Sequence, residues 1–484
     1  MIMSSQKLMN LGNMEKLKLF LSNFVIYGIG GIVRKAIPLI MLPIITRLIP
    51  EPKYYGLNDL SDIVISFASV IAIMGMYDAM YRYFFEKDDI VYKRTICSTT
   101  LFFTLSTSAF IFLFFITFKS RISIFLFNTD DYEILVCLIA IATLIGATNG
   151  IVAAPTQMQN KSKMYLSINT SAPVLAYAVS VPLLINGYYL VALPLAGIIS
   201  SFLIEIIFFL KNKEWFSPKY IDFDLLKKML RIAIPLAPSF LSYWVFNSCD
   251  RIMISNLIGI EENGIYAIGS KLGGASQLIY SAFSGGWLYF SYSTMKEKDQ
   301  VKSNSLVFEY LALIAFISCL FICSVAYEFY HYLFIGKYVN GYIVSAYLFL
   351  APLLLMLYQV LANQFIIKET SWPCTVILSL GAIINIVFNY IFIPRLGIEG
   401  AGIATLLGYF VAVAVMALIQ IKMKLLYIKW RFVLVMVYFL IYLTVWRLYF
   451  VDDIGYSFLL TIIFSGLMLY AYKKDILVFV SRIH

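Results

Sequence analysis

The stretch IITRLIPEPKYYGLNDLSD (44–62) has a counterpart, MISNLIGIEENGIYAIGSK (253–271), and the similarity of the two predicts the architecture. In each stretch an apolar run ends in Leu-Ile and a short polar turn follows. A glycine, Gly56 in the first and Gly264 in the second, then precedes the next apolar run. Similar segments at corresponding places along a chain indicate an internal repeat.

Two further pairs of segments occur in the same order and support the repeat. NKSKMYLSIN (160–169) corresponds to IKETSWPCTV (367–376), and GYYLVALPLAGIIS (187–200) corresponds to GIEGAGIATLLGYF (397–410). We therefore expect two parallel lobes of six spans around a central cavity, an arrangement typical of alternating-access transporters. The expected parts are an N-lobe (1–212), a C-lobe (213–424) and two additional C-terminal spans with a tail (425–484).

Apolar runs of membrane-spanning length fill the rest of the chain, which is 61% hydrophobic and 13% charged. A helix needs about 20 mostly apolar residues to cross a bilayer. The sequence predicts an all-α integral membrane protein with about fourteen transmembrane helices. These lie near 22–47, 59–82, 97–118, 134–159, 164–186, 189–210, 232–257, 265–290, 306–328, 342–367, 373–393, 398–421, 431–448 and 456–472.

The basic residues are distributed unequally between alternate connections. Of the 37 Lys and Arg, 26 fall in the N-terminal segment and every second gap, 7 fall in the other gaps and 4 lie within spans. Because Lys and Arg are retained on the cytoplasmic side, both termini are expected there, in the inner membrane of a bacterium. The start of the chain does not read as a cleaved signal peptide. Attraction to anionic membrane lipids accounts for the net charge of +10, so no nucleic acid partner is expected.

The sequence gives no pattern for catalysis, and we expect no enzyme, no metal site and no cofactor. There are two His, and no P-loop pattern is present. The pairs Asp88-Asp89, Asp130-Asp131 and Asp452-Asp453 could hold Mg²⁺ in a prenyl-phosphate transferase, but their positions between spans favour a role at helix ends. The six Cys are interpreted as packing residues.

Three segments resemble a known family. TRLIPEPKYYGL (46–57), GMYDAMYRYFFE (75–86) and DRIMISNLIG with GIYAIGSKL (250–272) are similar to motifs of the O-antigen flippases (Wzx-type). This family belongs to the multidrug/oligosaccharidyl-lipid/polysaccharide exporter superfamily. The resemblance implies a MATE-like fold and translocation of an undecaprenyl-diphosphate-linked oligosaccharide, an O-antigen or similar repeat unit of lipopolysaccharide, to the periplasmic leaflet.

The same resemblance implies coupling to a proton or sodium gradient, with polymerase and chain-length proteins as downstream partners. Two alternatives stay open from the residues themselves. One is a multidrug cation antiporter of the same superfamily, which would need acids deep in one lobe. The other is a membrane polysaccharide polymerase or ligase, a class in which one large outer loop is typical.

Charges within spans are costly and usually face a polar interior. Arg34 and Lys35 lie midway along the first span, and we favour Arg34 as the diphosphate contact because its planar guanidinium binds two oxygens at once. The alternative is an ion pair between helices. Further binding candidates are Arg251 and Lys271. Aromatic faces for the sugar rings are expected from Tyr243, Trp244, Tyr280, Trp287 and Tyr289, although such residues more often pack or line the membrane interface.

Acidic residues suggest gating and coupling. An Asp62–Lys271 or Asp59–Arg251 pair would close an outer gate, or would merely hold two helices of one lobe together; Arg251 could equally be neutralised by Asp250. Coupling candidates near the cytoplasmic ends of spans are Asp78, Arg82 and Glu205, for which the alternative is simple access to water.

Overall fold

The computed structural model describes residues 36–280, 283, 287, 291, 299–368, 370 and 372–475, and throughout these residues the regular structure is helical. Contacts divide the chain into two compact units that meet in sequence between Gly264 and Ile265. The predicted lobe boundary near residue 212 rests on the sequence repeat and stays a prediction.

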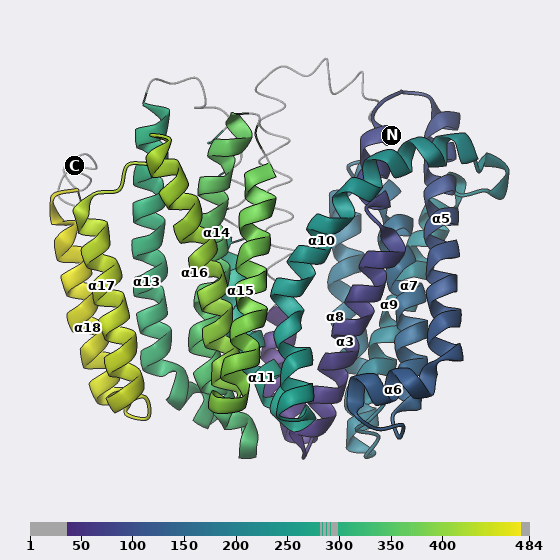
Figure 1. Ribbon diagram of the computed structural model, residues 1–484. Helices are drawn as coiled ribbons and strands as arrows, with labels where there is room; N and C mark the ends of the chain where they lie inside the picture. The colour runs from purple at the N-terminus through teal and green to yellow at the C-terminus, as the bar shows by residue number, and fades with distance from the viewer. Residues whose placement is uncertain are drawn as a thin grey trace. The chain divides into compact units, whose positions relative to one another are not determined.

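The first unit consists of long helices with short connections (Figure 1). The helix α7 packs against α3, α5 and α9, and α8 packs against α9. The elements are the helix Ala36–Leu48, α3 (Pro52–Ile73), α4 (Met76–Phe84), α5 (Ile90–Thr117), α6 (Lys119–Phe127), α7 (Glu133–Met158), α8 (Ser162–Ile185), α9 (Ala192–Asn212), the 3₁₀ turns η1 (Lys213–Trp215) and η2 (Pro218–Tyr220), α10 (Phe223–Leu257) and the start of α11 (Ile260–Gly273).

The second unit contains the rest of α11 and a second group of long helices, in which α14 packs against α13 and α16, and α15 against α16. Its elements are η3 (Gly274–Ser276), α13 (Gln300–Leu333), η4 (Gly336–Gly341), α14 (Tyr342–Ile367), α15 (Trp372–Leu396), α16 (Ile398–Lys422), α17 (Trp430–Val445), the π-helical turn η5 (Trp446–Phe450) and α18 (Ile454–Ala471).

Eleven helices among the described residues are long and apolar enough to cross a membrane, and Ala36–Leu48 is a shorter apolar helix. The prediction of an all-helical, multi-pass membrane protein is thus confirmed. The predicted spans 232–257 and 265–290 correspond to α10 and to the region of α11, where part of the second span lies outside the described residues. The number fourteen stays a prediction.

Acidic residues start several helices, as the sequence suggested for two of the three Asp pairs. The Asp89 carboxylate accepts hydrogen bonds from the backbone N–H groups of Val91 and Tyr92 at the start of α5. Asp453 does the same for Tyr456 at the start of α18. The first N–H groups of a helix have no partner within it, so a carboxylate there stabilises the helix end. These carboxylates are therefore occupied in the fold.

The second predicted span, 59–82, is wrong as a single helix. It is broken between α3 and α4, where Met74 (φ 46°) and Gly75 (φ 76°) adopt left-handed backbone conformations. At this break the chain passes very close to α10, and a Cβ on Gly75 would lie 2.6 Å from the carbonyl oxygen of Ala233. Glycine is required both by the backbone angle and by the lack of space.

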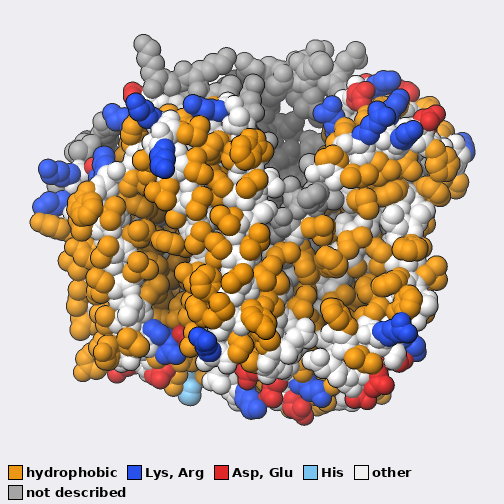
Figure 2. Space-filling model, in the orientation of Figure 1, with side chains coloured by type: hydrophobic (Ala, Val, Ile, Leu, Met, Phe, Trp, Pro, Cys, Tyr) orange, Lys and Arg blue, Asp and Glu red, His pale blue; other side chains and the backbone are white. Residues whose placement is uncertain are grey.

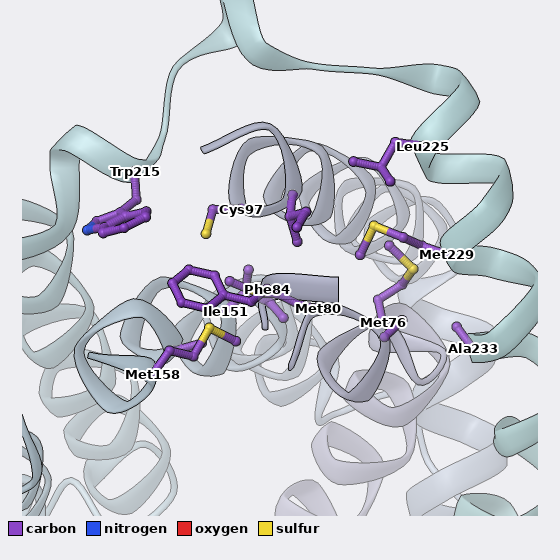
Figure 3. Close-up of a cluster of buried hydrophobic side chains, with 13 residues drawn as sticks. Met76, Met80, Phe84, Cys97, Ile151, Met158, Trp215, Leu225, Met229 and Ala233 are labelled. Atoms are coloured by element: carbon purple, nitrogen blue, oxygen red, sulfur yellow. The ribbon is translucent and has the colours of Figure 1, made fainter. Parts of the chain in front are cut away.

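Beyond this break along the chain, α4 contributes to an apolar cluster together with α5, α7, η1 and α10 (Figure 3). α10 contributes one face of its first half, namely Leu225, Met229 and Ala233, at intervals of four residues. Residues with this spacing share one side of a helix. The first half of α10 is therefore fixed to the first unit by one face, and its opposite face is left for other contacts.

Charged and apolar side chains are separated along the helices, as Figure 2 shows: hydrophobic side chains cover the surface between two zones that contain the Lys, Arg, Asp and Glu. Such a band matches a bilayer interior. In the first unit, the end that carries the connection 213–222 is the richer in basic residues. They are Lys87, Lys93, Arg94, Lys161, Lys163, Lys211, Lys213, Lys219, Lys227, Lys228 and Arg231.

Candidate functional site

One of the two ion pairs suggested by the sequence is present. Nη1 of Arg251 on α10 lies 3.4 Å from Oδ1 of Asp59 on α3. The Asp59 side chain is 3% exposed and that of Arg251 is 22% exposed, so the pair is largely shielded from water. Asp250 uses one carboxylate oxygen to accept the backbone N–H of Arg251.

The geometry of this pair leaves it only partly satisfied. A distance of 3.4 Å is long for a charge-assisted hydrogen bond, and Oδ2 of Asp59 is buried without a hydrogen-bond partner among the described residues. Burial of a carboxylate is costly unless its oxygens are bonded. The Asp59 carboxylate therefore contributes less to the contact between α3 and α10 than a carboxylate with both oxygens bonded would contribute.

A close contact between backbones lies beside this pair. A Cβ on Gly56 of α3 would overlap the carbonyl oxygen of Ile260 on α11, and a Cβ on Gly264 would overlap that of Pro52. Asn263 donates a hydrogen bond from Nδ2 to the carbonyl of Gly56, at 3.1 Å. We call these residues (Pro52, Gly56, Ile260, Asn263 and Gly264) the glycine seam. It holds α3 and the first turn of α11 in direct contact.

The second suggested pair joins residues of different units, and its existence stays a prediction. Asp62 on α3 is exposed and accepts a hydrogen bond from Asn58 at 3.3 Å. Lys271 on α11 is also exposed.

Two of the aromatic candidates are used in packing. Trp244 on α10 donates from Nε1 to Ser66 at 3.0 Å, and its ring lies 4.6 Å from that of Phe67 on α3. Trp287 is buried and stacks on Phe283 at 5.5 Å. Tyr280 is half-buried. A role of any of them toward sugars stays a prediction.

Several candidates fall outside the described residues. They are Arg34, Lys35 and Tyr289, together with the side chain of Tyr243. Their predicted roles are carried forward as hypotheses.

Glu205 occupies a polar contact between two membrane-length helices. Its Oε1 accepts a hydrogen bond at 2.7 Å from Thr148 on α7, and the neighbouring Asn149 donates to the carbonyl of Ser201 at 3.1 Å. Glu205 is half-buried, so this acid lies within the α7–α9 contact and does not extend freely into water. Asp78 and Arg82 are both exposed on α4.

The sequence did not reveal two ionic clusters in the second unit. Glu309 on α13 is 1% exposed and accepts two hydrogen bonds from Arg431 on α17, at 2.9 and 3.0 Å. Arg431 also pairs with Asp475 at 2.6 Å. In the other cluster, Arg447 in η5 donates to Glu399 in the first turn of α16 at 2.8 Å. Partners so distant in sequence cannot be matched by composition alone, although an acid inside a predicted span was a visible signal for Glu309.

Uncharged polar residues also gather inside the second unit. Asn385 on α15 donates to Thr405 on α16 at 3.1 Å, and Asn389 donates to Asn385 at 3.2 Å. Both amides are fully buried. These residues carry no charge, so the charges within spans do not point to them. The visible signal in the sequence is a pair of Asn residues four positions apart within an apolar run. Among the described residues, no group of three or more His, Cys, Asp or Glu could hold a metal.

The folds of solved structures define the class. The chain is similar to a structure described as the lipid II flippase MurJ in an inward closed conformation, with a TM-score of 0.69 and 13% identity over 95% of this chain and 99% of that one. It is also similar to a MATE structure in complex with MaL6 (TM-score 0.60, 12% identity, 84% and 96% covered). An inward-facing MATE transporter of the MOP superfamily gives 0.53 (16% identity, 81% and 98% covered). This is the fold of MurJ and MATE transporters.

The amino-acid sequence identifies the family to which the chain belongs. The model of the family described as Polysaccharide biosynthesis protein matches residues 20–289, more than half of the chain, and the protein belongs to that family. No curated protein sequence matches the chain. The resemblance drawn from the motifs is thereby confirmed at the level of family and fold.

Proposed function

We propose that this protein translocates a lipid-linked oligosaccharide across the membrane by alternating access, in the manner of a flippase. The observation that carries the proposal is the combination of the polysaccharide biosynthesis family with a MurJ-like fold over 95% of the chain. A lipid-linked glycan is the substrate class that connects the two. The carrier is proposed to be undecaprenyl diphosphate and the glycan an O-antigen or similar repeat unit.

The contacts of the first unit support a gating role for α3 and α10. The Asp59–Arg251 pair is buried but incompletely bonded, and the glycine seam beside it can form only while α3 and α11 are in contact. Both contacts join α3 to the segment 250–264, so a movement of that segment away from α3 would break them together. We propose that these contacts close the periplasmic side, with both termini in the cytoplasm of a bacterial cell and an ion gradient driving the cycle.

Arg34 is proposed to hold the diphosphate within the membrane. Arg34→Ala in a strain lacking the chromosomal gene is expected to give normal protein abundance and no surface glycan, and Arg34→Lys to retain part of the activity because the charge survives. Normal glycan display by a well-expressed Arg34→Ala protein would reject this role. Lys35 would then be tested in the same way.

The multidrug antiporter is the second candidate, because MATE structures share the fold. Export of cationic dyes separates the two functions. A flippase leaves dye accumulation unchanged and restores surface glycan, whereas an antiporter lowers dye accumulation and leaves the glycan phenotype of the deletion strain unaltered.

A further inference from the structure

The first half of α10 has one face that its own unit does not cover. Leu225, Met229 and Ala233 are buried in the apolar cluster of Figure 3. The opposite side carries exposed residues of two kinds, apolar and basic. They are Phe223, Lys227, Arg231 and Ile234, with Leu226 and Leu230 partly buried between them.

These residues line a groove with a volume of about 510 Å³. Lys227 and Arg231 are four residues apart, so they lie one above the other on the same side of the helix, with Cβ atoms about 5–6 Å apart. This spacing lets both cations reach the same ligand, whether it presents one anionic group or two adjacent ones. No acidic residue is among the described residues that line the groove.

The edges of the groove are apolar and open. Phe223 is 66% exposed and Ile234 is 52% exposed. Large apolar side chains exposed beside cations are found where a protein meets the boundary between lipid chains and headgroups. The groove is therefore suited to a ligand with an anionic head and a hydrocarbon chain, and it suits a free inorganic anion less well.

Charges of both signs are present beside the groove. Asp222 and Asp224 are exposed at the start of α10, and Asp222 accepts the backbone N–H groups of Asp224 and Leu225. On the adjoining turn, hydrogen bonds with Arg94 and Lys219 lower the pKa of the Tyr220 phenol. A lowered phenol pKa is what nearby cations produce.

We propose that the Lys227–Arg231 groove binds the diphosphate of the lipid-linked substrate at the membrane surface, with its prenyl chain along Phe223 and Ile234. The inference rests on the proposed function and adds to it a first docking position, separate from Arg34 in the first span. A diphosphate presents two adjacent charged groups to the two cations, whereas the phosphodiester of a phospholipid presents one. Guanidinium and ammonium groups both bind such oxygens strongly.

Binding of undecaprenyl diphosphate to the purified full-length protein tests the site, with native mass spectrometry as the readout. The double variant Lys227→Gln/Arg231→Gln is expected to bind at least about tenfold more weakly, the loss of two charged hydrogen bonds. Lys228→Gln is the matched control, because Lys228 is exposed on the same helix but lies about 100° around it and does not line the groove. Equal binding by the wild type and the double variant would overturn the site.

Competitors establish which ligand the groove prefers. Phosphatidylglycerol and inorganic pyrophosphate are each expected to displace undecaprenyl diphosphate only at large excess. Equal competition by phosphatidylglycerol would make the groove a general phospholipid contact, and equal competition by pyrophosphate would make it a free-anion site; either result overturns the assignment to substrate.

Complementation separates this inference from the function on which it rests. Failure of the wild-type protein to restore surface glycan in a deletion strain would reject the proposed flippase activity. If the wild-type protein restores surface glycan and the double variant binds undecaprenyl diphosphate as tightly as the wild type, the flippase activity stands and only the groove is rejected as a binding site.

Discussion

Gly56 and Gly264, which occupy matching positions in the internal repeat, lie against each other, and their contact is reciprocal. A Cβ on Gly56 would lie 2.9 Å from the backbone nitrogen of Gly264, and a Cβ on Gly264 would lie 3.1 Å from that of Gly56. Each would also overlap the carbonyl four residues before the other glycine, at Ile260 and Pro52. The contact thus joins α3 and the first turn of α11 at two positions that the predicted repeat makes equivalent.

Gly56→Ala and Gly264→Ala are expected to separate α3 from α11, because a methyl group has no room at either position. Overfilling a packed contact costs about 1–3 kcal/mol. Each variant should therefore lower Tm in detergent and reduce glycan display. Gly197→Ala on α9 is the control, since an added Cβ there meets nothing within 4 Å. If both seam variants keep the Tm and transport of the wild type, the seam has no gating role.

The Asp59–Arg251 pair predicts strong coupling between two substitutions. Removing one member of a buried ion pair costs about 3–5 kcal/mol, because the other charge is left buried. Asp59→Asn and Arg251→Gln should each destabilise the protein, and the double variant should be destabilised by less than the sum of the two, with a coupling energy of about 0.5–3 kcal/mol. Thermal unfolding of the four proteins measures it. Asp62→Asn, at an exposed position on the same helix, should be close to neutral. Additive effects would show that the two side chains do not interact.

Glu205→Gln tests the coupling hypothesis without removing the contact to α7. Glutamine keeps an acceptor for the Thr148 hydroxyl but cannot carry a charge or release a proton. The variant is expected to reach normal abundance. It should lose the part of glycan export that depends on a proton gradient, which is the part that an uncoupler abolishes in the wild type. Thr148→Val, which removes the hydrogen bond and keeps the acid, should retain export. Uncoupler-sensitive export by Glu205→Gln at the wild-type rate would assign Glu205 a structural role.

Membrane orientation is tested by introduced cysteines. Asp130 lies between α6 and α7 and Glu214 lies in η1, and both are exposed. Asp130→Cys should react with an impermeant thiol reagent in intact cells, and Glu214→Cys should react only after the membrane is permeabilised. Labelling of the wild type, which has six Cys, gives the background. The reverse pattern would place the termini outside the cytoplasm.

The pH dependence of the melting temperature should show how much the ionised carboxylate of Asp475 stabilises the folded protein. Burial acts to raise its pKa, but hydrogen bonds from Tyr310 and Arg431 outweigh burial and lower the pKa below the usual 3.8. A carboxylate with a lowered pKa stabilises the folded state above its unfolded pKa, and this contribution disappears as the pH falls through the folded value. The Tm difference between wild type and Asp475→Asn should thus shrink below pH 4. Because this pair is still partly open to solvent, its contribution is about 1 kcal/mol. A constant difference down to pH 3 would contradict this, and Asp130→Asn serves as the control.

The helices were predictable from hydropathy because each one must be apolar over a membrane thickness. The sequence also suggested the Asp59–Arg251 pair, since both charges lie in the outer part of predicted spans, where an ion pair could close a gate. The break at Met74 and Gly75 was not predictable in this way, because it depends on a backbone conformation and on the approach of Ala233, more than 150 residues away. Trp244 was assigned to sugar binding from its type alone, and only the fold shows its hydrogen bond to Ser66.

The bond between Glu309 and Arg431 has a consequence for biosynthesis. The two residues are 122 positions apart, and a ribosome adds about 5–20 residues per second. Glu309 is therefore synthesised roughly 6–24 s before Arg431, a delay set by the same elongation rate. Until its partner arrives, the Glu309 carboxyl has to be accommodated in another way, such as by a bound proton, a bound insertase or a position at the lipid headgroups. Insertion of α17 is thus the step that completes this ion pair, and it is where a stalled or slowed ribosome would leave an incompletely assembled protein for membrane proteases.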